Sequence, residues 1–283
     1  FNTIHLPETA TILADEVQNV RAFGSEDQLQ GVQEVVNNRL MKMRRQLEAT
    51  HEWQRIGGIR GKILDADGAT TLIDVYDRFG LSQPSVTITF GTDPVHNKAL
   101  DVLEKIEDGL GADPFMTVRA FCGKQFWRDL LSDDTVREAY LNTQAAARLR
   151  GDPRESFEYA GIIWERYRGN VAGNAYVPDG EAYAVPEGVP DMFITRFAPA
   201  DYTEAVNTIG LPVYAKSEPL RFDKGVELEA QSNPLHLPTR PLGIVKIVSG
   251  YDEVATERLC TLYGDIVDAG LHRAPTIETA EAA

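Results

Sequence analysis

Apolar residues recur every three or four positions between residues 25 and 55, which is the spacing of one side of an α-helix. Ser25 is a suitable N-cap, and the acids that follow it favour the positive end of the helix dipole. Only Gly31 interrupts the pattern. We therefore predict one continuous helix from residue 26 to about residue 52, a long strut that faces a sheet. Its apolar stripe consists of Leu29, Val32, Val36, Leu40, Met43 and Leu47.

Strand-like and helical patterns alternate along the rest of the chain. Residues 1–24 are predicted to form an extended, partly amphipathic arm. Strands are predicted where β-branched and aromatic residues concentrate, at 59–68, 71–80, 85–90, 115–123, 226–235 and 240–250. Amphipathic helices are predicted at 97–111, 124–131 and 134–150. Because helices and strands interleave without a regular βαβ rhythm, the predicted fold class is α+β.

Composition narrows the classes of partner. The 283 residues are 43% hydrophobic, enough for one elaborate domain or two intertwined ones. No apolar run approaches the ~20 residues that cross a bilayer, so we expect no membrane partner. Cys122 and Cys260 are too few and too far apart for a disulfide framework, which is typical of a reducing cytoplasm. The net charge of −15 disfavours tight binding to DNA.

The candidate chemical motifs each lack a required residue. The sequence HEWQR resembles the start of a zinc protease motif, but Arg55 replaces the second histidine. The sequence DADGATTLIDVY offers Asp65 and Asp67 but lacks the later ligands of a calcium loop, so a β-turn is favoured. Cys122 has apolar neighbours and is expected to be a small buried hydrophobe. We therefore predict no catalytic residue, no cofactor and no metal site.

Three separated blocks resemble one known family. They are LPETATILADEVQNVRAFGSED near the start, MTVRAFCGKQFWRDLLSDDTVREAYLN at 116–142, and YVPDGEAYAVPEGVPDMFITRFAPADYTEAVNTIGLPVYAK at 176–216. Together they resemble the tailed-phage major capsid protein E family, the lambda-type head proteins. The resemblance implies the Hong Kong 97-type capsid fold, with an extended E-loop, a peripheral domain carrying a long spine helix, and an axial domain.

The resemblance also implies a division of the chain. Residues 1–24 would be the returning limb of the E-loop, 25–92 the peripheral domain with its spine helix, and 93–219 the axial domain. Residues 220–250 would supply closing strands. Residues 251–283 lie beyond the resemblance, and their spacing predicts an amphipathic helix ending at Gly270, then a disordered tail. The family has an arm and an outgoing E-loop limb before the position of Phe1, which we expect to have been removed or left out.

The family implies a structural function. The chain would be the major capsid protein of a tailed double-stranded DNA phage or prophage, assembling with itself as hexamers and pentamers into an icosahedral shell. It would belong to the virion and be assembled in the host bacterial cytoplasm, with decoration, scaffold and portal proteins as further partners. Two alternatives stay open from the residues alone: a head decoration or other phage structural binding protein, and a hydrolase whose residues meet only in space.

One charged cluster is a candidate subunit contact. The predicted strut carries Arg39, Lys42, Arg44 and Arg45, whose simplest interpretation is a solvated helix face. The family geometry lays one subunit's E-loop over the next subunit's peripheral domain. We therefore expect these basic residues to meet acids of a neighbouring arm, with Glu8, Asp15 and Glu16 as candidates.

Overall fold

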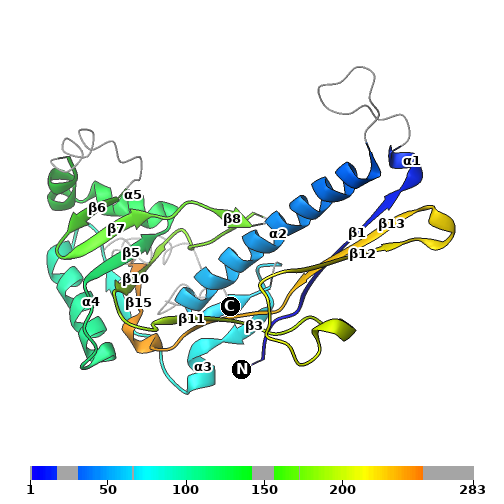
Figure 1. Cartoon of the computed structure of the whole chain (residues 1–283). Coiled ribbons are helices and arrows are strands. Elements are labelled where there is room, and N and C mark those ends of the chain that lie inside the picture. Colours follow the sequence, from blue (N-terminus) through cyan, green and yellow to red (C-terminus); the bar gives the residue numbers. More distant parts are fainter. Residues whose placement is uncertain (1, 18–30, 66, 142–155, 172, 251–283) are drawn as a thin grey trace, which may run out of the picture.

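The computed structural model describes residues 2–17, 31–65, 67–141, 156–171 and 173–250. In these parts the chain forms an elongated molecule with a sheet at each end and one long diagonal helix joining them (Figure 1). The predicted C-terminal helix and tail, together with Ser25 and Leu29 of the predicted strut, lie outside the described residues.

The long helix is α2, Val32–Arg60. The helix begins six residues later than predicted. Gly31, which we expected to lie inside the helix as a weak position, has an extended backbone (φ −75°, ψ 148°) and is the N-cap. The helix also continues past residue 52, and stops at Gly61, whose left-handed backbone (φ 86°) closes the last turn. A side chain at Gly61 would clash, since a Cβ there would lie 2.3 Å from the ring of Tyr76.

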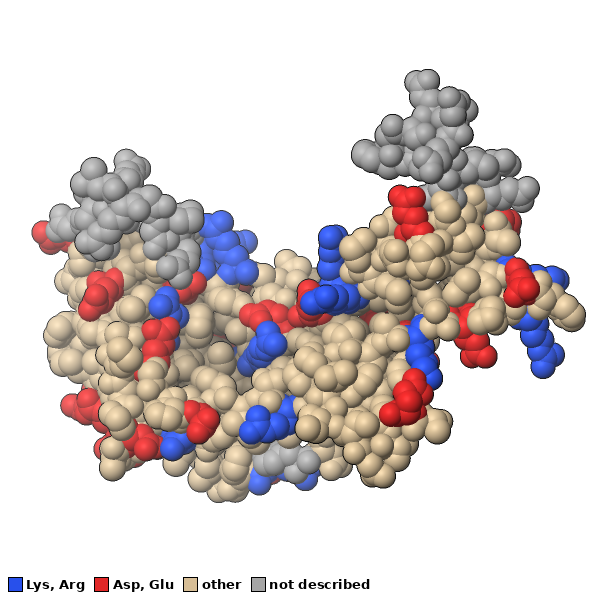
Figure 2. Space-filling model, in the orientation of Figure 1, with Lys and Arg blue, Asp and Glu red and all other residues tan. Residues whose placement is uncertain are grey.

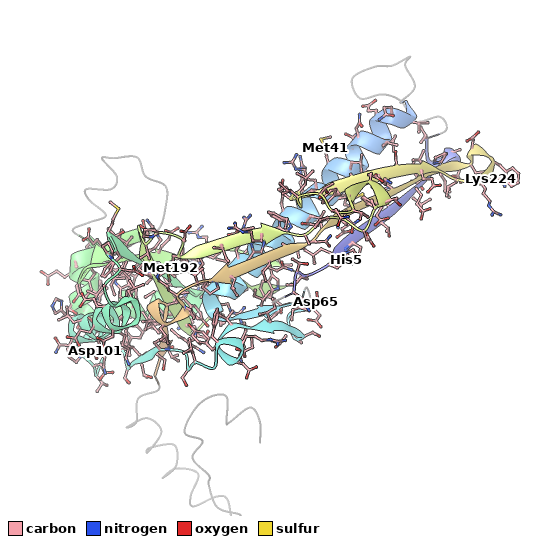
Figure 3. All side chains as sticks on the ribbon, turned by 60° about the horizontal axis from the view of Figure 1, so that its bottom comes forward. His5, Met41, Asp65, Asp101, Met192 and Lys224 are labelled. Carbon is pink, nitrogen blue, oxygen red and sulfur yellow. The ribbon has the colours of Figure 1, made fainter. Side chains whose placement is uncertain are left out.

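The predicted apolar stripe faces a sheet, as expected. Val36, Met43 and Leu47 are buried and Leu40 packs against them, whereas Val32 at the helix start is 49% exposed. The sheet is antiparallel and has the order β1-β13-β12, formed by Leu6–Leu13, Gly225–Ser232 and Tyr214–Pro219. The β12–β13 hairpin ends near Lys224, at the tip of the molecule (Figure 3).

A six-stranded sheet forms the other end of the molecule. Its order is β4-β15-β10-β5-β7-β6, in which β4–β15 and β5–β7 pair in parallel and the other neighbours are antiparallel. The strands are Ser85–Ile88, Val245–Ser249, Glu181–Glu187, Thr117–Cys122, Ile162–Arg166 and Ser156–Tyr159, in that order. Helices α4 (Val95–Leu110) and α5 (Lys124–Ser132) pack against it in one core. This mixture of helix and mixed sheet confirms the α+β class.

Smaller elements connect the two ends. Strands β2 (Lys62–Leu64) and β3 (Thr71–Asp74) form a hairpin, and β11 (Phe193–Phe197) pairs with β14 (Pro234–Pro238). Other short elements within the described ranges include α1 (Ala14–Val17), α3 (Val75–Phe79), β8 (Asn170–Val171) and β9 (Asn174–Ala175), with 3-10 turns at Thr203–Ala205, Arg221–Asp223 and Pro241–Gly243.

The strand predicted at 71–80 is half wrong. It ends at Asp74, whose side chain accepts a hydrogen bond from the Asp77 backbone N–H (3.0 Å) and so starts α3. A local cap therefore overrides the β-branched pattern of this segment. Likewise, the start of the strand predicted at 59–68 belongs to the last turn of α2.

Sheet membership divides the chain at other points than the predicted domain boundaries. Strand β4 lies before residue 93 but joins the six-stranded sheet, and β12 lies within 93–219 but joins the three-stranded one. The closing strands at 220–250 are shared between both sheets. Residues 6–13 pair with β13 along their whole length. The assignment of these parts to E-loop, peripheral and axial domains stays a prediction.

The stripe supports a first prediction. We expect Met43→Ala to lower the free energy of unfolding of the unassembled full chain by ~2–5 kcal/mol, because it empties a site that is 2% exposed. Met41→Ala on the same helix is the matched control, since Met41 is 51% exposed, and it should cost less than ~0.5 kcal/mol. Urea unfolding measures both. Equal effects of the two substitutions would show that α2 does not pack on β1 and β13 in this way.

Candidate assembly surface

The basic cluster predicted on the strut lies on α2 and is partly paired within the chain. The Arg39 guanidinium lies 3.7 Å from the Glu16 carboxylate, and Arg44 pairs with Glu48 one turn along the helix at 2.9 Å. The structure thus brings Arg39 together with one of its predicted partners, but inside one subunit. Both pairs are largely exposed, so each contributes no more than ~1 kcal/mol.

Lys42 and Arg45 are the two members of the basic cluster that are not paired in this way. Both side chains are exposed, and neither forms an ion pair with any of the described residues. Figure 2 shows basic side chains gathered over the middle of the molecule, along the course of α2. These two cations are therefore available to groups outside the subunit.

The predicted acidic partners occupy different environments. Asp15 and Glu16 are exposed in the short helix α1 that follows β1. Glu8 is half-buried and shares one face of β1 with Ala10 and Ile12, the face that packs on α2. Among the described residues neither Glu8 nor Asp15 forms an ion pair. Asp15 is thus free for a neighbour, whereas Glu8 is poorly placed for one.

A second charged group was not found from the sequence. Arg119 on β5 lies between Glu165 on β7 and Glu187 on β10, with N–O distances of 2.6 Å to each. The paired Arg119 lowers the pKa of Glu187, and the two carboxylates raise the pKa of Arg119. Because these residues are 46 and 68 positions from Arg119, only the strand order reveals the group. It ties three neighbouring strands together across one face of the sheet.

Two buried histidines mark the place where α2 crosses β13 and β14. The rings of His51 on α2 and His236 on β14 lie edge to face, 5.7 Å apart, and both contact Phe197. The Thr195 hydroxyl lies 2.9 Å from Nδ1 of His236. Nε2 of His236 is buried without a hydrogen-bond partner among the described residues. Since 185 residues separate the two histidines, sequence spacing could not have paired them.

Burial keeps both rings neutral. It lowers the pKa of His51 and lowers that of His236 to about 4, and the nearby Arg55 cation acts in the same direction on both. Protonation of His236 would place a charge where no described residue offers an acceptor to Nε2.

The same junction contains one candidate pair of a nucleophile and a general base, Ser232 and His51. Nε2 of His51 lies 2.8 Å from the Ser232 hydroxyl. That hydroxyl donates its proton to the carbonyl of Pro212 (2.6 Å), and Ser232 is fully buried. The serine proton therefore points away from the base, and no substrate could reach the oxygen. The arrangement is a structural joint.

Comparison with known proteins identifies the family to which this structure belongs. The family described as phage major capsid protein E matches residues 1–249.

The chain belongs to the phage major capsid protein E family.

Individual relatives agree with this membership. The chain is 28% identical over 274 residues to the major capsid protein of Pseudomonas phage KPP10, covering 87% of this chain and 76% of that protein. It is 26% identical over 288 residues to the major capsid protein of Salmonella phage Felix O1, covering 87% and 77%. Among solved structures, the putative capsid protein of a prophage of E. coli CFT073 matches with a TM-score of 0.54 at 16% identity, covering 88% and 77%. The last likeness concerns the fold alone.

The sequence-based identification is therefore confirmed. The chain has the Hong Kong 97-type capsid fold and is a structural protein of the phage capsid, located in the virion. The hydrolase alternative is wrong, because this family is structural and not enzymatic. The decoration-protein alternative is replaced by the shell protein itself. None of the helices in the described ranges is both long and apolar enough to cross a bilayer.

The histidine joint predicts acid sensitivity. Above pH 6.5 both rings are neutral in the folded and unfolded states, so their contribution to stability is complete. As the pH falls from 6.5 towards 4, His236 is protonated in the unfolded chain but stays neutral in the folded one, so the free energy of unfolding decreases. For His236 the loss is at most about 3.5 kcal/mol, from about 1.4 kcal/mol for each pH unit of that window.

Urea unfolding of the unassembled chain between pH 4 and 8 measures this effect. We expect His236→Gln to flatten the dependence of unfolding free energy on pH, while His96→Gln, an exposed histidine on α4, leaves it unchanged. A wild-type slope retained by His236→Gln would assign the acid sensitivity to other groups.

Proposed function

We propose that this chain is the repeating subunit of an icosahedral head that encloses the double-stranded DNA of a tailed phage or prophage, built from hexamers and pentamers. The observation that carries the proposal is the way α2 is anchored at both ends. Its first half packs on β1 and β13 through Met43 and Leu47. Its second half packs through Trp53 and Ile56 against residues of the β8–β10 region. A helix of 29 residues, roughly 43 Å long, thus holds the two sheets in one fixed relation.

A fixed relation between the two ends is what a closed shell requires of its subunit. If each copy holds its two ends at one angle, the angular variation needed for both hexamers and pentamers is confined to the contacts between copies. We extend the proposal to assembly in the host bacterial cytoplasm, with scaffold, portal and decoration proteins as further partners. Cys122 is buried, its thiol pKa is raised by burial, and it forms no disulfide with any described residue, which is compatible with that compartment.

We also propose that the exposed cations of α2 take part in subunit contacts. Lys42 and Arg45 would meet acids of a neighbouring arm, with Asp15 as the best placed of the predicted partners and Arg39, Arg44 and Glu16 already engaged within the subunit. Each exposed pair contributes only ~0.2–1 kcal/mol, but the contact is repeated over the whole shell.

The test is a charge reversal. We expect the double variant Lys42→Glu, Arg45→Glu to raise the protein concentration needed for assembly, measured by sedimentation velocity of the full chain, and added Asp15→Lys to restore part of it. The matched control places the same charge change on α4, at Lys98 and Lys105. If the α2 variant assembles at the same concentration as wild type, Lys42 and Arg45 are part of a solvated helix face and not of a subunit contact.

The acidic surface gives a separate expectation about the genome. Because the net charge is −15, we expect the isolated full chain to bind duplex DNA with no measurable affinity at physiological salt. The shell would enclose DNA without gripping it and without reading its sequence. Fluorescence anisotropy of a labelled duplex measures this. Micromolar binding at that salt concentration would contradict a container that encloses DNA without binding it.

A further inference from the structure

One loop shows an uncharged, apolar surface to solvent. The segment between β11 and β12 contains the sequence AVNTIGLPV at 205–213, nine residues without a charge in a chain of net charge −15. Its side chains of Val206, Ile209 and Leu211 are 61%, 90% and 55% exposed. We call these three residues the apical patch. Single exposed apolar residues are common, but three on one short loop suggest a binding surface.

The loop that carries the apical patch is fastened to β13 and the residue after it. Asn233 accepts a hydrogen bond from the Ala198 backbone N–H and donates one to the Pro199 carbonyl, both at 2.9 Å. Gln231 donates to the Asp201 carboxylate at 2.7 Å, and Ser232 donates to the Pro212 carbonyl at 2.6 Å. Both ends of the loop are thus held by three consecutive residues, the last two of β13 and the one that follows it.

One ion pair and two aromatic rings lie beside the loop. Lys216 lies 2.7 Å from the Glu204 carboxylate and 4.7 Å above the ring of Tyr202. The Tyr202 ring in turn packs edge to face with Tyr214, 6.3 Å away, and the Tyr214 hydroxyl accepts a hydrogen bond from the Leu211 N–H (2.9 Å). These contacts pair Lys216 with Glu204 beside the apex, and residues 205–213 themselves carry no charge.

The backbone of the loop has little freedom. A Cβ at Gly210 would lie 2.0 Å from the carbonyl oxygen of Phe197, so the chain passes too close there for any other residue. Asn207 adopts a left-handed conformation with φ 62°. The apical patch is therefore displayed on a loop of fixed shape, and little conformational entropy remains to be lost when a partner covers it.

We propose that the apical patch is a contact surface for a second copy of this chain. Copies that each carry −15 repel one another, so they can approach most closely where no charge is present. The cores of protein interfaces are likewise depleted in charge and rich in buried apolar side chains. This inference rests on the proposed self-assembly, and it assigns one of the contacts by which that assembly is held.

The test uses two substitutions at the most exposed position. Ile209→Asn removes the apolar surface without adding charge, and Ile209→Val keeps most of it. Because Ile209 is 90% exposed, both full-length variants should unfold like wild type before assembly. We expect Ile209→Asn to raise the concentration needed for assembly at least tenfold in sedimentation velocity, and Ile209→Val to assemble like wild type.

A labelling measurement identifies what covers the patch. In an Ile209→Cys variant, we expect the thiol at 209 to react readily with maleimide in the unassembled chain and to be protected in assembled particles, with the labelled peptide identified by mass spectrometry. Protection already present before assembly would mean that another segment of the same chain covers the patch, and would overturn the inference.

The remaining outcomes separate this inference from the proposed function. If wild type and Ile209→Asn assemble equally well, the patch is not a subunit contact, while the shell function stands. If Ile209→Asn assembles normally but no longer retains a second head protein, the patch binds that protein and the inference is also overturned. If wild type itself does not assemble under any condition, the proposed function fails first.

Discussion

Burial of the apolar stripe of α2 on strands β1 and β13 is the interaction on which the rest of the structure depends. A helix of this length has no reason to lie straight across a molecule unless one side of it is removed from water. Met43 and Leu47 on that side of the helix pack in one buried cluster with Ile12 of β1 and Leu228 of β13. Since β1 and β13 come from opposite ends of the described chain, this packing also brings those ends together along eight residue pairs. The strut, the arm and the connection between the two sheets thus have one common cause.

The same helix meets a polar joint at its other half. There His51, His236 and Ser232 are buried and close to one another, where apolar side chains would have packed without any directional requirement. Directional groups of this kind fix one relative position of helix and sheet. A capsid subunit needs such a fixed geometry more than it needs high stability, because each angular error in one copy is repeated in every copy. These buried polar residues fix the position of the helix on the sheet, and they do not form a catalytic site among the described residues.

Much of the fold was readable from periodicity, and the part that was not has physical reasons. The stripe of α2 and the helix α4 follow from spacing, because a one-sided helix shows its buried face in the sequence. The start of α2 was placed wrongly because Gly31 tolerates both helical and extended backbone, and the structure uses it as a cap. Helix α3 was missed because the local cap at Asp74 overrides the β-branched pattern.

The candidate contacts show the same limit. Arg39 and Glu16 were predicted to meet across a subunit boundary, whereas the structure pairs them within one subunit, and spacing alone cannot tell these two cases apart. The histidine joint and the Arg119 group need the pairing of distant strands, which no local pattern contains. The identity of the family came instead from three blocks of residues. The loop at 198–213 lies within the third of those blocks, and its structure shows that it is hydrogen-bonded to β13 and has an apolar apex.

The most direct measurement of the central claim is a cryo-electron microscopy reconstruction of particles assembled from the full-length chain. The account predicts a closed icosahedral shell in which residues 32–60 of every subunit form one unbroken helix, packed on strands β1 and β13 of that subunit. A closed shell in which this helix is broken, or in which β1 leaves its own β13 to pair with a neighbour, would contradict the strut as the organising element. Particles that never close would contradict the function itself.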